Sequence, residues 1–223
     1  MSENTGNLKL IGTTETNGGR FGEVRIVGES RIHGPMECGR FSCTGTADIA
    51  GDLKAETLKL TGELTIQGNL TAGKGQLTGE IRVHGGCRGD RLKQNGQLTV
   101  QGDCEYESLR VNGAVQVDGL LSAETLELRL YGPSDAKEVG GGRISVKRSR
   151  VAAIRNWFAT AGPYLMTAEL IEGDIVELEH THAQVVRGNR VRLGPGCEIG
   201  RVEYRRSLSK AGGAEVGAEE KID

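Results

Sequence analysis

The sequence predicts an all-β fold: a right-handed parallel β-helix, a three-sided solenoid with 17-residue turns, carrying a short basic helical insert near residues 147–161. Glycine is abundant, at 35 of 223 residues, whereas a typical chain has roughly 7% glycine. The glycines recur at a fixed spacing, and apolar residues keep fixed positions between them. Proline occurs only 4 times, which excludes a collagen repeat.

Two ladders of glycines, each with a 17-residue step, define the repeat over residues 28–129. The first ladder marks position 1 of each repeat: Gly28, Gly45, Gly62, Gly79, Gly96 and Gly113. The second ladder marks position 7: Gly34, Gly51, Gly68, Gly85, Gly102 and Gly119. Self-similarity at a constant period indicates a solenoid, in which each turn stacks on the previous one.

Within each repeat, apolar residues two apart alternate with polar ones, as in a strand with one face turned inward. These pairs fall at positions 3 and 5 and at positions 14 and 16, and a third inward segment lies near positions 9–11. Position 5 is β-branched throughout: Ile32, Ile49, Ile66, Val83, Val100 and Val117. Three inward segments describe a triangular coil, and its right-handed sense follows the usual rule for parallel crossovers. Antiparallel hairpins and a left-handed hexapeptide coil fit the constant 17-residue phase poorly.

The repeat weakens towards both ends, and residues 1–131 and 168–206 are predicted to form the β-helix. Upstream, Leu8 and Leu10 fit the inward pair of an earlier turn if one residue is missing. The final turns are carried by Val191, Leu193, Cys197, Ile199, Val202 and Tyr204. The tail at 207–223, rich in glycine and acidic residues, is predicted to be disordered.

Residues 132–167 break the period and are predicted to form a loop followed by a basic amphipathic helix. The loop signals are Pro133 and the triplet Gly140–Gly142. The predicted contact residues of the insert are Arg148, Arg150, Ile154, Arg155, Trp157 and Phe158. Bases beside large aromatic residues suit an anionic membrane surface. The alternatives are that the helix folds back over the coil, or that it binds a homologous subunit or an envelope protein.

Charge and hydropathy exclude several classes of protein. The net charge of −2 gives no overall field towards nucleic acid, so no nucleic-acid partner is expected. The sequence has no run of 18 apolar residues typical of a transmembrane helix, and its N-terminus lacks the layout of a signal peptide. We therefore expect a cytoplasmic protein with reduced cysteines, peripheral to the inner face of the membrane if the insert binds there.

No group of residues predicts catalysis, a metal site or a cofactor. His33 and His84 share a column but lie three turns apart, too far to share a metal ion. His180 and His182 lie two residues apart but have no third ligand. Cys87 and Cys104 are expected to stack as buried thiols in adjacent turns. The outward acids form no carboxylate pair of the kind that glycoside hydrolysis requires. The chain is therefore predicted not to be an enzyme, and a carbohydrate-active β-helix enzyme stays as an alternative.

A ridge of bases follows positions 13 and 15 along one face: Arg40, Lys59, Lys74, Arg91, Lys93 and Arg110. The neighbouring position 12 carries acids: Glu56, Asp90, Glu107 and Glu124. We expect ion pairs between these columns on a solvated face. Nucleic-acid binding is disfavoured because no aromatic residues are interleaved with the bases.

The repeat resembles that of the bactofilins, a family of bacterial polymer-forming cytoskeletal proteins. The resemblance is carried by GELTIQGNLTAGKGQLT and GQLTVQGDCEYESLRVN, and the ending VVRGNRVRLGPGCEIGRVEY is similar to the Gram-positive branch. It covers residues 5–131 and 168–206 and implies a right-handed β-helix that polymerises end to end without nucleotide. Such polymers support cell shape, envelope or motility structures. The insert and the very short N-terminal tail depart from the family, so targeting through an N-terminal membrane anchor is not carried over.

The two ends of the coil are the predicted polymer contacts, because a β-helix ends in unpaired backbone groups and an apolar cross-section. At the N-terminal end these contacts are Leu8, Leu10 and Ile11, and at the other end Val202 and Tyr204. The predicted partner is a second copy of the chain or a homologous subunit. The alternatives are a monomer whose ends are capped by the tails or the insert, and an envelope adaptor that acts through the insert.

Overall fold

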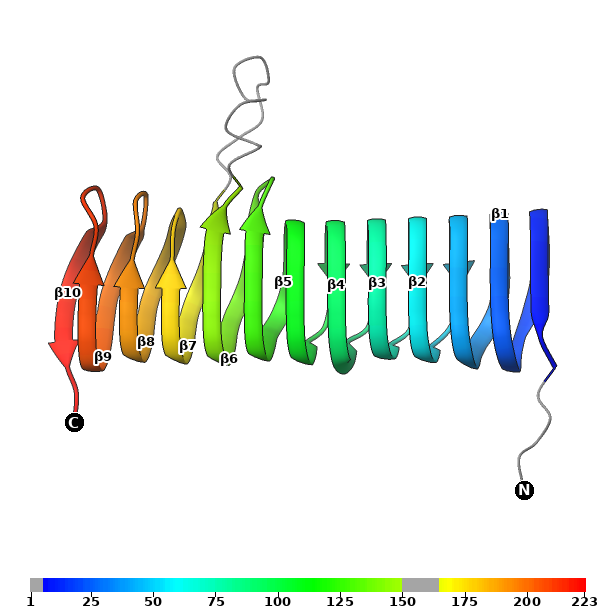
Figure 1. The fold of residues 1–223 in the computed structure, drawn as a ribbon, viewed down its shortest axis with the longest axis horizontal. Coiled ribbons are helices and arrows are strands. Elements are labelled where there is room, and N and C mark those ends of the chain that lie inside the picture. The colour runs from blue at the N-terminus through cyan, green and yellow to red at the C-terminus, as the bar shows by residue number, and fades with distance from the viewer. Residues whose placement is uncertain (1–5, 150–164) are drawn as a thin grey trace, which may run out of the picture.

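The computed structural model describes residues 6–149 and 165–223 and contains a single ten-stranded parallel sheet wound into a rod. The strands follow one another in sequence order, and the two ends of the chain lie at opposite ends of the rod (Figure 1). Their bounds are β1 (Leu8–Ile49), β2 (Leu53–Ile66), β3 (Leu70–Val83), β4 (Cys87–Val100), β5 (Cys104–Leu130), β6 (Ser134–Arg148), β7 (Met166–Leu178), β8 (Thr181–Leu193), β9 (Glu198–Lys210) and β10 (Glu215–Lys221). The predicted β-solenoid is confirmed.

The strand register confirms the 17-residue period of the repeat. Ile49 of β1 pairs with Ile66 of β2, which pairs with Val83 of β3, and the same step continues into β4 and β5. In β2 the buried side chains fall into three pairs: Leu53 and Ala55, Leu58 and Leu60, and Leu64 and Ile66. The core is therefore a bundle of columns that run the length of the rod.

Glycine at position 1 of the repeat is required at the corner of the coil. Gly62 has a φ of +129°, a backbone conformation that other residues rarely adopt. A Cβ atom at this position would collide with the carbonyl oxygen of Gly45 in the turn below. The same stacking recurs up the ladder, so each corner glycine allows the next turn to approach closely.

The segment predicted to be a loop before the insert is a strand. β6 pairs in parallel with β5 and with β7. Arg148 pairs with Leu130 in this strand, so Lys147 and Arg148 do not begin a helix. The glycine triplet packs the strand closely, because a Cβ at Gly141 would collide with the carbonyl oxygen of Ala123. The rest of the predicted helix, at 150–161, lies outside the described residues.

The tail predicted to be disordered is also part of the coil. β9 continues to Lys210, and β10 adds a further turn that pairs in parallel with β9. Val216 lies opposite Ile199 and packs, half-buried, against the core. The acidic composition of 207–223 hides this turn, although the 17-residue step continues from Ile199 to Val216.

The turn length is not constant beyond β5. Between β7 and β8 the 17-residue step is replaced by a 15-residue step, as in the pairing of Leu178 with Leu193. The corner is again made by glycine: a Cβ at Gly188 would meet the carbonyl oxygen of Gly173, which itself lies above Gly141. A separate series of glycines, Gly141, Gly173 and Gly188, thus takes the place of the position-1 ladder in this half of the rod; we call it the C-terminal glycine series.

Candidate functional site

The N-terminal end of the rod combines apolar side chains with an open strand edge. Leu10 is 9% exposed and belongs to the core, Leu8 packs half-buried against it, and Ile11 is 60% exposed. Phe21 in the same part of β1 is also only partly buried. Among the described residues no strand pairs with the outer edge of this turn. Such an edge presents unpaired backbone N–H and C=O groups to another chain.

The C-terminal end differs from the sequence prediction. Val202 is fully buried and Tyr204 is half-buried, because they lie opposite Glu219 and Lys221 of β10. These two predicted polymer contacts therefore lie one turn inside the rod. The outer edge belongs to β10, which is mostly exposed and carries three acids: Glu215, Glu219 and Glu220.

A buried carboxylate, that of Glu203, lies in an ion network near this end. Arg187 donates to Glu203 at 2.6 Å and to Glu172 at 2.9 Å, and Arg201 lies 2.8 Å from Glu203. The hydrogen bond from Arg187 lowers the pKa of the Glu203 carboxyl group and raises the pKa of the guanidinium. A carboxylate held ionised in this way cannot act as a general acid. Glu172, Arg187 and Glu203 come from β7, β8 and β9, so the network joins these three strands.

A groove of about 560 Å³ runs along β6–β9 next to this network. Its lining contains the C-terminal glycine series and several acids, including Glu138, Glu172 and Asp174. Asn189 donates to Asp174 at 2.7 Å, and Glu172 is bound to Arg187. Two of these three acids are thus engaged in contacts across turns, which is the arrangement of a structural surface.

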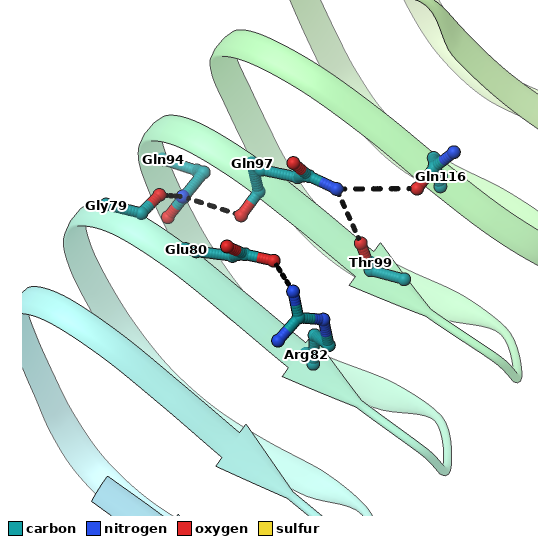
Figure 2. Close-up of polar contacts among 7 residues, drawn as sticks. All are labelled: Gly79, Glu80, Arg82, Gln94, Gln97, Thr99 and Gln116. Atoms are coloured by element: carbon teal, nitrogen blue, oxygen red, sulfur yellow. Dashed lines mark hydrogen bonds and ion pairs between the residues drawn. The ribbon is translucent and has the colours of Figure 1, made fainter. Parts of the chain in front are cut away.

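Figure 2 shows the buried polar residue of the central turns. Gln94 replaces the leucine of its column and is fully buried. Its side-chain nitrogen donates to the carbonyl oxygens of Gly79 at 2.8 Å and of Gln97 at 3.0 Å. On the outer surface Gln97 bonds Gln116 and Thr99 (Figure 2). The bonds from Gln94 to Gly79 and from Gln97 to Gln116 join neighbouring turns.

The histidines and cysteines make isolated contacts. His33 lies 3.3 Å from Glu15, and His182 lies 3.1 Å from Glu198. The Sγ atoms of Cys87 and Cys104 are 3.0 Å apart in the core, and the pKa of Cys104 is raised by this contact and by burial. In the part of the chain that the structure describes, no three His, Cys, Asp or Glu residues could hold a metal ion.

The basic columns do not form the ion pairs that the sequence suggested. Arg110 binds Glu127 through two nitrogens, at 2.8 and 2.9 Å, within the position-15 column itself. Between residues 6 and 149, none of the position-12 acids forms an ion pair with the position-13 and position-15 bases. A depression of about 240 Å³ is lined by Lys59, Lys74, Arg91 and Lys93. The sequence predicts this ridge of bases, but it does not predict that their charge is left unpaired.

The predicted contact residues of the insert are only partly described. Arg148 lies half-buried in β6. Arg150, Ile154, Arg155, Trp157 and Phe158 lie outside the described residues. Over residues 6–149 and 165–223, no helix is long and apolar enough to cross a membrane.

Comparison with known proteins finds relatives over part of the chain. No family model matches it, and no solved structure matches it. Two uncharacterized proteins of Bacillus subtilis (strain 168) are similar to it. YhbF is 43% identical over 86 residues, which is 38% of this chain and 34% of YhbF. YhbE is 40% identical over 88 residues, 38% of this chain and 35% of YhbE. The chain thus spans about a third of the length of the curated relatives it matches.

Proposed function

We propose that the chain is a non-enzymatic structural protein that assembles end to end, without nucleotide, into filaments. In this role it serves the shape, envelope organisation or motility of a bacterial cell, from the cytoplasm or from the inner face of the membrane. The observation that carries the proposal is the N-terminal end of the rod, where core residues meet an open strand edge. The resemblance of the repeat to the bactofilins supports the same function.

The physical basis of assembly is continuity of the sheet. In the described sheet, the backbone of every internal turn pairs with the turns above and below it, whereas the first turn pairs on one side only. A second copy, or a homologous subunit, that added its own terminal turn would complete the backbone hydrogen bonds and cover Leu8, Leu10 and Ile11. Because the contact consists of backbone and apolar groups, it needs no nucleotide.

Electron microscopy of the purified chain without nucleotide tests the proposal. Wild type should form filaments about as wide as the rod. The substitution Leu10→Asp should shorten or abolish them, because a charge would be buried in the contact without a partner. Glu63→Lys, on an exposed outward column, is the matched control and should leave the filaments unchanged.

Circular dichroism separates loss of assembly from loss of fold. Leu10→Asp should stay β-rich, since Leu10 lies at the end of the core. A wild-type chain that stays monodisperse at high concentration would exclude filament assembly. Filaments of normal length from Leu10→Asp would show instead that the N-terminal end is not the contact.

A further inference from the structure

One side of the rod carries an excess of positive charge that extends well beyond the predicted ridge. It is formed by the outward residues at positions 13, 15 and 17 of seven successive strand segments, from Arg40–Thr44 to Arg143–Lys147, whose register is continuous. We call this side the cationic face. Its bases are Arg40, Lys59, Lys74, Arg91, Lys93, Arg110, Arg129, Arg143 and Lys147, and all are exposed.

The cationic face contains a single acid, Glu127, against nine bases. The net charge of the cationic face is therefore +8. Because the whole chain carries −2, all its other residues together carry −10. This separation of charge is hidden in the composition, which is nearly neutral. The other outward residues of the face are Ser, Thr, Gln and Asn.

Most of this charge is not compensated within the protein. Arg110 is paired with Glu127, and Lys147 with Glu177. The other seven bases form no ion pair within the described ranges 6–149 and 165–223. Like charges lie directly opposite each other on neighbouring strands, as in the pairs Lys74–Arg91 and Arg129–Lys147. Such pairs destabilise a sheet unless an external anion neutralises them.

We infer that the cationic face binds the anionic headgroups of a lipid bilayer, with the rod lying flat on the membrane. Adjacent strands of a sheet are about 4.8 Å apart, so the seven segments extend over roughly 29 Å and present a planar grid of charge. A bilayer offers phosphates over the whole of such a plane. The depression between Lys59, Lys74, Arg91 and Lys93 is the densest part of the grid and could receive a headgroup phosphate.

A nucleic acid fits this face less well. A duplex is a cylinder that meets a plane along a narrow line, and a single strand is bound through aromatic side chains on which its bases stack. The outward positions of the cationic face carry no aromatic residue. The proposed contact does not depend on end-to-end assembly, although a filament would present many such faces and bind with higher avidity.

Co-sedimentation of the full chain with lipid vesicles, at a protein concentration too low for filaments to pellet without lipid, tests this inference. Wild type should pellet with vesicles that contain phosphatidylglycerol and stay in solution with pure phosphatidylcholine. Binding should disappear at about 0.5 M NaCl, where exposed charges are screened over a few ångströms. Each base near an anionic leaflet strengthens binding about fivefold, so Lys74→Glu/Arg91→Glu should weaken it at least about 25-fold.

The matched control is Arg88→Glu/Lys137→Glu, which changes the net charge by the same amount on other sides of the coil. Both bases are exposed, and neither forms an ion pair with the described residues. This variant should bind anionic vesicles like wild type. Thermal melts of both variants establish that the fold is retained.

Several results would overturn the inference. Wild type could fail to pellet with anionic vesicles, or the two charge-reversal variants could lose binding equally. If the cationic-face variant bound normally while Trp157→Ala/Phe158→Ala did not, the membrane contact would belong to the insert. Binding of duplex DNA without binding of vesicles, or salt-sensitive dimers in sedimentation without lipid, would assign the face to a nucleic acid or to a second copy.

Discussion

Val100 lies in the middle of the β-branched column, between Val83 and Val117, and all three side chains are buried. Val100→Asp would place a charge in a dry core with no partner, and we expect no soluble folded protein or a much lower melting temperature. Glu63 points outward, so Glu63→Lys should change the free energy of unfolding by less than about 0.5 kcal/mol. Thermal melts followed by circular dichroism compare the two, and the reverse ranking would contradict the assignment of faces.

Glu203 should make the last turns sensitive to acid. The hydrogen bond from Arg187 lowers its pKa below the ordinary value of 4.5, so the carboxylate stabilises the fold above that pH. This stabilisation is lost as the pH falls through the lowered pKa. Glu203→Gln should therefore be less stable than wild type at pH 7 in urea, and the difference should shrink in strong acid. A difference independent of pH would show that the charge of Glu203 is not the cause.

At the scale of a single turn, the two kinds of corner glycine differ in what they tolerate. Gly62→Ala would force a side chain against the backbone of the turn below, in addition to straining a φ of +129°. Gly34 also has a positive φ, of +105°, but a Cβ there would meet no atom within 4 Å. We expect Gly34→Ala to lose about 1–2 kcal/mol of stability and Gly62→Ala clearly more, measured by unfolding in denaturant. Equal losses would mean that strain alone, and not the close approach, fixes the corner.

The strands from β2 to β5 could be predicted from the sequence because their corner and core residues keep one phase. β6 and β10 were missed for physical reasons. In β6 the triplet Gly140–Gly142 has the composition of a loop, but here it brings two strands into close contact. In the last turn, from residue 211 onward, only Ala214 and Val216 of the described residues pack on the core, so apolar periodicity is almost absent. The error in β10 also displaced two predicted polymer contacts, because Val202 and Tyr204 are predicted from the sequence to close the last turn.

For the whole molecule, the constant 17-residue period predicts that one complete turn can be deleted without loss of the fold. Deleting Gly62–Thr78 joins Thr61 directly to Gly79, so the glycine ladders and the core columns continue without a break. In the Leu10→Asp background, in which filaments should not form, we expect a β-rich rod that is shorter in small-angle X-ray scattering and only modestly less stable. The control deletion Gly62–Leu70 leaves an incomplete turn that cannot close, and it should lower the melting temperature sharply. Similar melts for the two deletions would mean that the turn is not the structural unit.

The cationic face could be predicted only in part from the sequence. Its seven bases from Arg40 to Arg129 follow the 17-residue phase, whereas Arg143 and Lys147 join it through a longer step, because the register shifts between β5 and β6. Whether a base is compensated depends on the position of acids in neighbouring turns. Glu127 neutralises Arg110 from within the same column, while Asp90, next to Arg91 in sequence, forms no ion pair in the described part of the chain. Whether a base and a nearby acid form an ion pair depends on side-chain geometry, which the periodicity of the sequence does not reveal.

The succession of strands, in which β1 and β10 touch one neighbouring strand each, determines how the rod opens over time. In the described sheet the first turn and the last are separated by all the others. Fluctuations should therefore begin as fraying at the two tips and advance inward, one turn after another. In hydrogen exchange, the amides of β4 and β5 should retain their protons longest, while those near Leu8 and Lys221 exchange first. A subunit joined at one tip would slow exchange there before any other part of the rod responded.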